Sequence, residues 1–123
     1  MSANRLDVLK ALIELSSPLN DLRSSLQKFD WDFQGVPIEF GRIHLVNVLR
    51  RYLNRELVAT DIEQWANLLE AREDIFFEKN AEGQLDEVLY ELANPVLTAS
   101  LDDDRASAII EALTGGLSRE FDL

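Results

Sequence analysis

The chain has 123 residues, 46% of them hydrophobic and 28% charged, which suits one globular domain able to bury a core. It contains no cysteine, so disulfides, thiol nucleophiles and cysteine-ligated zinc are excluded, and a reducing compartment fits. Residues 1–62 carry eight basic and eight acidic side chains, whereas residues 63–123 carry four and fifteen and hold the whole formal charge of −11, which argues against nucleic-acid binding.

The segment up to residue 29 is expected to form two helices. Apolar residues recur at helical spacing between residues 6 and 13, and Ser17 followed by Pro18 is typical of a second helix start. These apolar residues are spaced rather than continuous, so no signal peptide is predicted, and no run approaches the roughly 18 apolar residues that a membrane helix needs. We therefore expect a cytoplasmic protein with no membrane partner.

Residues 30–41, DWDFQGVPIEFG, interrupt the helical pattern with two glycines and a proline. The segment is nevertheless very apolar for a loop, since it contains Trp31, Phe33, Val36, Ile38 and Phe40. We expect a packed connection with a short extended piece. Its aromatic side chains are expected to cover the core rather than to bind a ligand.

The next helical pattern, RIHLVNVLRRYLN, contains the single histidine and begins a group of arginines at positions 42, 50, 51 and 55. The arginines lack interleaved aromatics, so we expect them to pair with the acidic half of the chain. His44 has no serine or carboxylate at a spacing that would make a catalytic relay. A surface or core histidine is therefore expected, and the protein is not expected to be an enzyme.

Thr60-Asp-Ile-Glu63 has the pattern of a capping box, in which Thr60 caps a new helix and Glu63 reaches back to it. The apolar residues that follow lie at helical spacing and predict a buried stripe of Ile62, Trp65, Ala66 and Leu69. Thr60 and Glu63 are thus interpreted as structural residues, and Trp65 as a core residue.

Two more helices are expected toward the C-terminus. Residues 80–83, NAEG, predict a turn, and Asn94-Pro95 should stop the helix that follows it. Ser100 is expected to cap a last helix that ends at Gly115. The sequence therefore predicts one all-α domain over residues 1–123, a compact bundle of five or six helices with one apolar connection that contains glycine and proline.

No metal or cofactor site is expected. Glu87 and Glu91 are four residues apart, but no Glu-x-x-His motif accompanies them. The run of aspartates at 102–104 lacks the glycine and the distal glutamate of a calcium loop. Negative charge at the start of a helix explains it more simply.

The carboxylates around EAREDIFFE are the predicted partner-binding residues. Glu70, Glu73 and Asp74 are three or four residues apart, so they could share one side of a continuing helix, where like charges repel. The complete predicted acidic face consists of Glu70, Glu73, Asp74, Glu78, Glu87 and Glu91. A basic protein partner would be attracted to it, but a solvated face that serves solubility remains an alternative.

Residues 48–78, VLRRYLNRELVATDIEQWANLLEAREDIFFE, and 85–113, LDEVLYELANPVLTASLDDDRASAIIEAL, resemble small acidic bacterial toxin-immunity proteins of the colicin D type. The shared layout is a helix, a short turn with its capping residue, and a further acidic helix. The resemblance implies a protein that binds a cationic nuclease toxin domain and masks its active site. The chain departs from the smallest such proteins by two additional N-terminal helices, and no individual contact residue is transferred from the family.

Two functions are therefore carried forward. The first is a non-catalytic immunity protein that binds a basic nuclease toxin domain from a bacterial competition system. The alternative is a regulatory or structural interaction protein, including a homo-oligomer, which an exposed apolar patch near Trp31, Phe33, Phe76 and Phe77 would favour.

Overall fold

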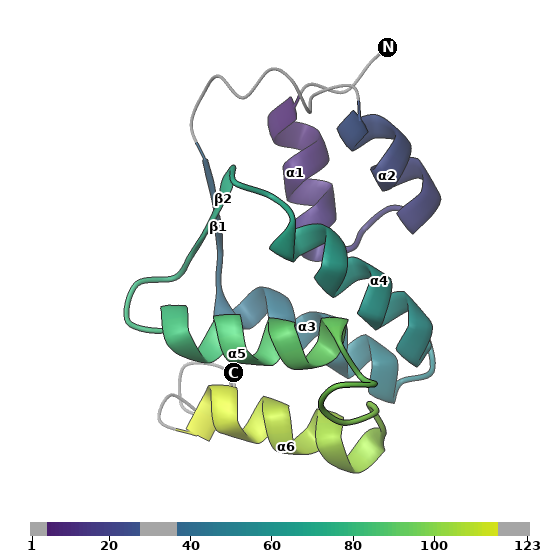
Figure 1. Cartoon of the computed structure of the whole chain (residues 1–123), viewed down its shortest axis with the longest axis vertical. Coiled ribbons are helices and arrows are strands. Elements are labelled where there is room, and N and C mark those ends of the chain that lie inside the picture. Colours follow the sequence, from purple (N-terminus) through teal and green to yellow (C-terminus); the bar gives the residue numbers. More distant parts are fainter. Residues whose placement is uncertain (1–4, 28–36, 116–123) are drawn as a thin grey trace.

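The computed structural model describes residues 5–27 and 37–115, which form helices joined by short connections and one very small sheet (Figure 1). The elements in chain order are α1 (Arg5–Glu14), α2 (Leu19–Gln27), β1 (Ile38–Phe40), α3 (Arg42–Leu53), α4 (Ala59–Glu70), β2 (Ile75–Phe77), α5 (Glu82–Ala93) and α6 (Asp103–Thr114). The predicted all-α architecture is confirmed. None of the helices in the described ranges is long and apolar enough to cross a membrane.

The helices pack in three pairs, α1 with α2, α4 with α5, and α3 with α6 (Figure 1). α1 lies beside α2 at one end of the molecule, and α4 packs most extensively against α5. α3 packs against α6, which runs antiparallel to α5 and is joined to it by a hydrogen bond from Gln84 Nε2 to the Ala112 carbonyl (3.1 Å).

Trp65 occupies the centre of the core, as its spacing predicted. Its side chain is fully buried, together with the predicted stripe of Ile62, Ala66 and Leu69. The indole Nε1 donates a hydrogen bond of 2.6 Å to the carbonyl of Leu12, so α4 is fixed to the end of α1. The ring of Phe40 meets the indole edge-on at a centroid distance of 5.8 Å.

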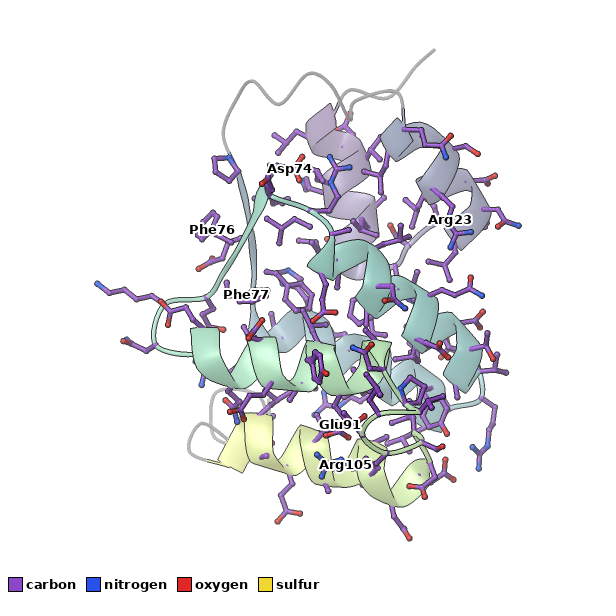
Figure 2. All side chains as sticks on the ribbon, in the orientation of Figure 1. Arg23, Asp74, Phe76, Phe77, Glu91 and Arg105 are labelled. Atoms are coloured by element: carbon purple, nitrogen blue, oxygen red, sulfur yellow. The ribbon has the colours of Figure 1, made fainter. Side chains whose placement is uncertain are left out.

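The short extended piece predicted before residue 41 is β1, which pairs in parallel with β2. Ile38, Glu39 and Phe40 lie opposite Ile75, Phe76 and Phe77. Phe40 is buried. Phe76, two residues after the buried Asp74, is 48% exposed (Figure 2). The predicted aromatics Trp31 and Phe33 lie outside the described residues.

The predicted capping boxes are wrong in detail. α4 begins at Ala59, two residues earlier than a Thr60 cap predicts, and the Asp61 carboxylate, not Glu63, reaches back to accept a hydrogen bond of 3.0 Å from the Val58 amide. Thr60 is exposed in the first turn. α6 is capped by Asp102, whose carboxylate accepts from the Arg105 amide (2.7 Å), instead of by Ser100. In both places an aspartate near the predicted cap, instead of the predicted residue, accepts a hydrogen bond from a backbone amide at the helix start.

The position of the α4 cap gives a matched pair of substitutions. We expect Asp61→Ala to lower the free energy of unfolding by about 1 kcal/mol, because an amide at the helix start loses its acceptor and the helix dipole loses a favourable charge. Thr60→Ala should change it by less than about 0.5 kcal/mol. Urea denaturation measures both, and a larger loss for Thr60→Ala would place the cap at Thr60 after all.

Trp65 offers a second test of the core. Trp65→Ala should destabilise the protein by about 3–5 kcal/mol, because it leaves a cavity between α1, α4 and β1. Trp65→Phe should cost less, since it keeps most of the ring volume and removes the hydrogen bond to Leu12. Denaturation of both variants provides the comparison, and equal losses would mean that the volume of the indole contributes little.

Candidate functional site

The six carboxylates predicted to form one acidic face do not lie on one helix. α4 ends at Glu70, and the chain then turns into β2 within five residues, so Glu70, Glu73 and Asp74 cannot share one side of a continuing helix. That expectation is wrong. The tertiary structure separates the six residues into carboxylates held in intramolecular ion pairs and carboxylates left at the surface.

Asp74 is a structural residue. Its side chain is 2% exposed and accepts two hydrogen bonds from the Arg72 guanidinium, from Nε to Oδ1 (3.0 Å) and from Nη2 to Oδ2 (2.8 Å). Its backbone carbonyl accepts from the Ile38 amide (2.9 Å), which begins the pairing of β1 with β2. A buried charge needs such a partner, so the pair of Asp74 with Arg72 serves the fold.

Glu78 is also committed within the chain. Its carboxylate accepts hydrogen bonds from the Arg42 side chain and from the Arg42 amide (2.9 Å), which is one of the unpaired amides at the start of α3. The hydrogen bonds from Arg42 hold the pKa of Glu78 below its usual value, although burial opposes the shift. A Cβ atom at Gly41 would lie only 3.1 Å from Glu78 Oε1, so glycine suits this close approach.

Glu91 connects two helices. It pairs with Arg105, and Figure 2 shows the two residues together between α5 and α6. Arg55 and Asp103 form a further two-bond pair, with the shorter contact at 2.7 Å, between the end of α3 and the start of α6. The expectation that the arginines pair with the acidic half of the chain is therefore confirmed for Arg42 and Arg55. Arg51 instead donates to the Leu15 carbonyl (2.8 Å).

A smaller acidic surface remains where α4 lies against α5. Glu70 at the end of α4 is close enough to Asp86 on α5 for the two charges to repel. Asn67 joins the same two helices through a hydrogen bond from Nδ2 to the Ala93 carbonyl (3.3 Å). We name Glu63, Glu70, Asp86 and the 48%-exposed Tyr90 the α4–α5 face. Within residues 5–27 and 37–115, none of its three carboxylates forms an ion pair.

The electrostatics of this face are unfavourable for the isolated protein. Partial burial, and then the nearby negative charge of Asp86, raise the pKa of Glu70 above its usual value. A group whose pKa is raised on folding contributes stability at low pH that is lost as the pH rises through its folded pKa. At neutral pH the ionised Glu70 therefore opposes folding slightly, and a cationic partner would relieve this repulsion.

Of the six predicted residues, Glu70 alone belongs to the α4–α5 face. Glu73 is exposed in the turn before β2, and Glu87 is exposed one turn from Glu91 on α5. Contact of the six with a partner stays a prediction. Sequence reasoning missed Asp86 and Tyr90, although their i, i+4 spacing on the polar side of one helix was a signal.

His44 is committed to a helix start. Its Nδ1 accepts a hydrogen bond of 2.8 Å from the Gly41 amide, and its ring stacks on Phe40 at a centroid distance of 5.7 Å. Burial lowers the pKa of His44, although Glu14, Glu39 and Glu78 act in the opposite direction. The neutral ring is the form that can accept at Nδ1. In the part of the chain that is described, no three histidine, aspartate or glutamate side chains gather as a metal site would require.

Comparison of the chain with protein-family models, with curated proteins and with solved structures gives no match.

The half-buried, neutral His44 predicts that the stability of the protein depends on pH. The pKa of His44 in the folded chain lies below the unfolded value of about 6.5. As the pH falls through the range between these two pKa values, the unfolded chain binds more protons than the folded chain, so the free energy of unfolding should fall as well. Urea denaturation of wild type and His44→Gln between about pH 5 and pH 7 tests this expectation. The glutamine variant should lose the slope, because its amide does not titrate. An unchanged slope would assign the effect to another group.

Proposed function

We propose that this protein is a non-catalytic binding protein, an immunity protein that binds a basic bacterial nuclease toxin domain and masks its active site. The observation that supports this most directly is the α4–α5 face. Glu70 and Asp86 lie close enough for their charges to repel, and neither they nor Glu63 forms an ion pair within residues 5–27 and 37–115. A surface of this kind matches a cationic partner.

The charge of a nuclease explains why such a surface would be useful. A domain that binds phosphates must carry a positive cleft, and an acidic protein can occupy that cleft in place of the nucleic acid. Complementary charge also accelerates the encounter, with rates well above the roughly 10⁵–10⁶ M⁻¹s⁻¹ of neutral pairs. Rapid binding suits a protein that has to neutralise a toxin before damage occurs.

The arrangement of the remaining polar groups agrees with a binding role. His44 already accepts a hydrogen bond from the Gly41 backbone amide, and its lowered pKa favours the neutral ring. Arg42, Arg55 and Arg105 are each engaged by a carboxylate from another element. These groups contribute to the fold, whereas Glu70 and Asp86 form no ion pair within the described residues and keep their charge for a partner.

Self-association is the second candidate function. Phe76 is 48% exposed on a two-stranded sheet, and an exposed aromatic beside a strand edge can pair with a second copy. Each copy, however, carries the same formal charge of −11, and this repels a second copy at low ionic strength. Sedimentation of wild type and Phe76→Ser separates the two functions, because only an oligomer would shift in mass.

Charge reversal on the α4–α5 face tests the proposal. Glu70→Lys with Asp86→Lys should keep the fold, because both side chains are exposed. The double variant should associate about tenfold more slowly than wild type, at low ionic strength, with a basic nuclease toxin domain that wild type binds. The salt dependence of the association rate should also flatten. Asp74 is left unchanged because its reversal would break a buried pair.

The matched control makes the same charge change elsewhere. Glu14→Lys with Glu111→Lys reverses two exposed carboxylates on α1 and α6 and should reduce the rate much less. Stopped-flow measurements over a range of salt concentrations compare the three proteins. If both double variants slow association equally, total charge and not this face directs the encounter.

A further inference from the structure

The connection between α5 and α6 is held firmly by its own polar groups. The Thr98 hydroxyl hydrogen-bonds to the carbonyls of Glu91 (3.0 Å) and Asn94 (2.8 Å), and the Leu97 and Thr98 amides also donate to Asn94 (3.0 Å each). At its other end the Tyr52 hydroxyl donates to the Leu101 carbonyl (3.3 Å). The segment is therefore a fixed part of the surface.

This rigid segment presents two aliphatic side chains to solvent. Val96 is 97% exposed and Leu97 is 72% exposed, the largest values among the exposed large hydrophobic residues of the described chain. Neither side chain contributes appreciably to the core, and polar residues are the usual choice at such a turn. Single exposed aliphatic residues are ordinary, but two adjacent ones form an apolar projection whose burial by a partner would be favourable.

A groove of about 180 Å³ lies beside the same segment, which lines it with Pro95, Ala99 and Ser100. Leu92, Pro95 and Leu101 supply apolar lining from the α5–α6 side, while Ile62 and Glu63 line it from α4. Glu63 belongs to the α4–α5 face, so the groove joins the acidic surface to the projecting loop. The lining also includes Thr60 and Ser100, and Glu63 is its one carboxylate. A largely apolar groove with one carboxylate fits a lysine or arginine side chain, whose stem is aliphatic and whose head is charged.

We propose that Val96 and Leu97 form an apolar anchor that docks on a basic protein partner. In this complex the groove receives one lysine or arginine side chain of the partner, and Glu63 binds the charged head of that side chain. This inference rests on the proposed function and adds the place of contact. A second copy of the chain is the poorer occupant, because each copy brings a formal charge of −11. A cationic protein is complementary both to Glu63 and to the adjoining α4–α5 face.

The anchor and the acidic face make separable contributions to binding. Charges at a surface mostly change the association rate and its salt dependence, whereas a desolvated apolar anchor mostly changes the dissociation rate. The hydrogen-bonded loop also loses little conformational freedom on docking, which favours slow dissociation. The kinetic effect of the anchor should therefore persist at high ionic strength.

The test measures dissociation from the same basic nuclease toxin domain that serves to test the proposed function. Val96→Ser with Leu97→Ser should raise the dissociation rate by about tenfold or more at both low and high ionic strength and leave the association rate nearly unchanged. Leu6→Ser is the matched control, since Leu6 is 46% exposed on α1, at the far end of the molecule (Figure 1). Glu63→Gln should weaken binding less as salt is raised, because screening already removes part of its contribution.

Each result bears on a different statement. Tight binding by wild type with an unchanged dissociation rate for Val96→Ser and Leu97→Ser would overturn the anchor and leave the proposed function standing. Unchanged affinity of Glu63→Gln would overturn the role of the groove. Failure of the wild-type protein to bind the toxin domain would overturn both proposals together. Circular dichroism and urea denaturation should show that the variants stay folded, as the exposure of Val96 and Leu97 implies.

Discussion

The hydrogen bond from the Trp65 indole to the Leu12 carbonyl is the contact around which the rest of the molecule is arranged. It joins two residues that are 53 positions apart in the chain. Its acceptor is a carbonyl in the last turn of α1, where helix carbonyls lack intrahelical partners. Phe40 packs on the indole and also meets Phe77, at a centroid distance of 6.3 Å. The position of the core thus sets the position of both strands and of Glu78, which follows β2 directly and caps α3.

Folding brings basic side chains of the first half of the chain together with acidic side chains of the second half. The sequence has a neutral half and a strongly acidic half, but Arg42 and Arg55 of the neutral half pair with Glu78 and Asp103 of the acidic half. Such exposed or partly exposed pairs contribute little stability individually, and their greater effect is to decide which carboxylates remain available. Net charge read along the chain therefore overstates the number of carboxylates that a partner could contact.

Local patterns were enough to predict much of the helical fold. The spacing around Trp65 indicated its burial, and Asn94-Pro95 ended α5 where expected. The segment after Glu70 was misjudged because its helix formers resemble a continued helix, whereas pairing with β1, more than 30 residues earlier, makes it a strand. Helix spacing also could not show that Asp86 lies beside Glu70, since this follows from how α4 and α5 pack.

The α4–α5 face combines rigidity with an electrostatic cost. Its two helices form the most extensive helix contact in the described chain, and the Asn67 hydrogen bond to Ala93 fixes their relative position. Burial and Asp86 raise the pKa of Glu70, so ionisation there opposes folding. Selection for stability alone would favour a lysine at one of these positions, as Arg105 illustrates beside Glu91. Two like charges held close on this surface would suit the proposed cationic partner, because it would convert their repulsion into an attraction that both carboxylates share.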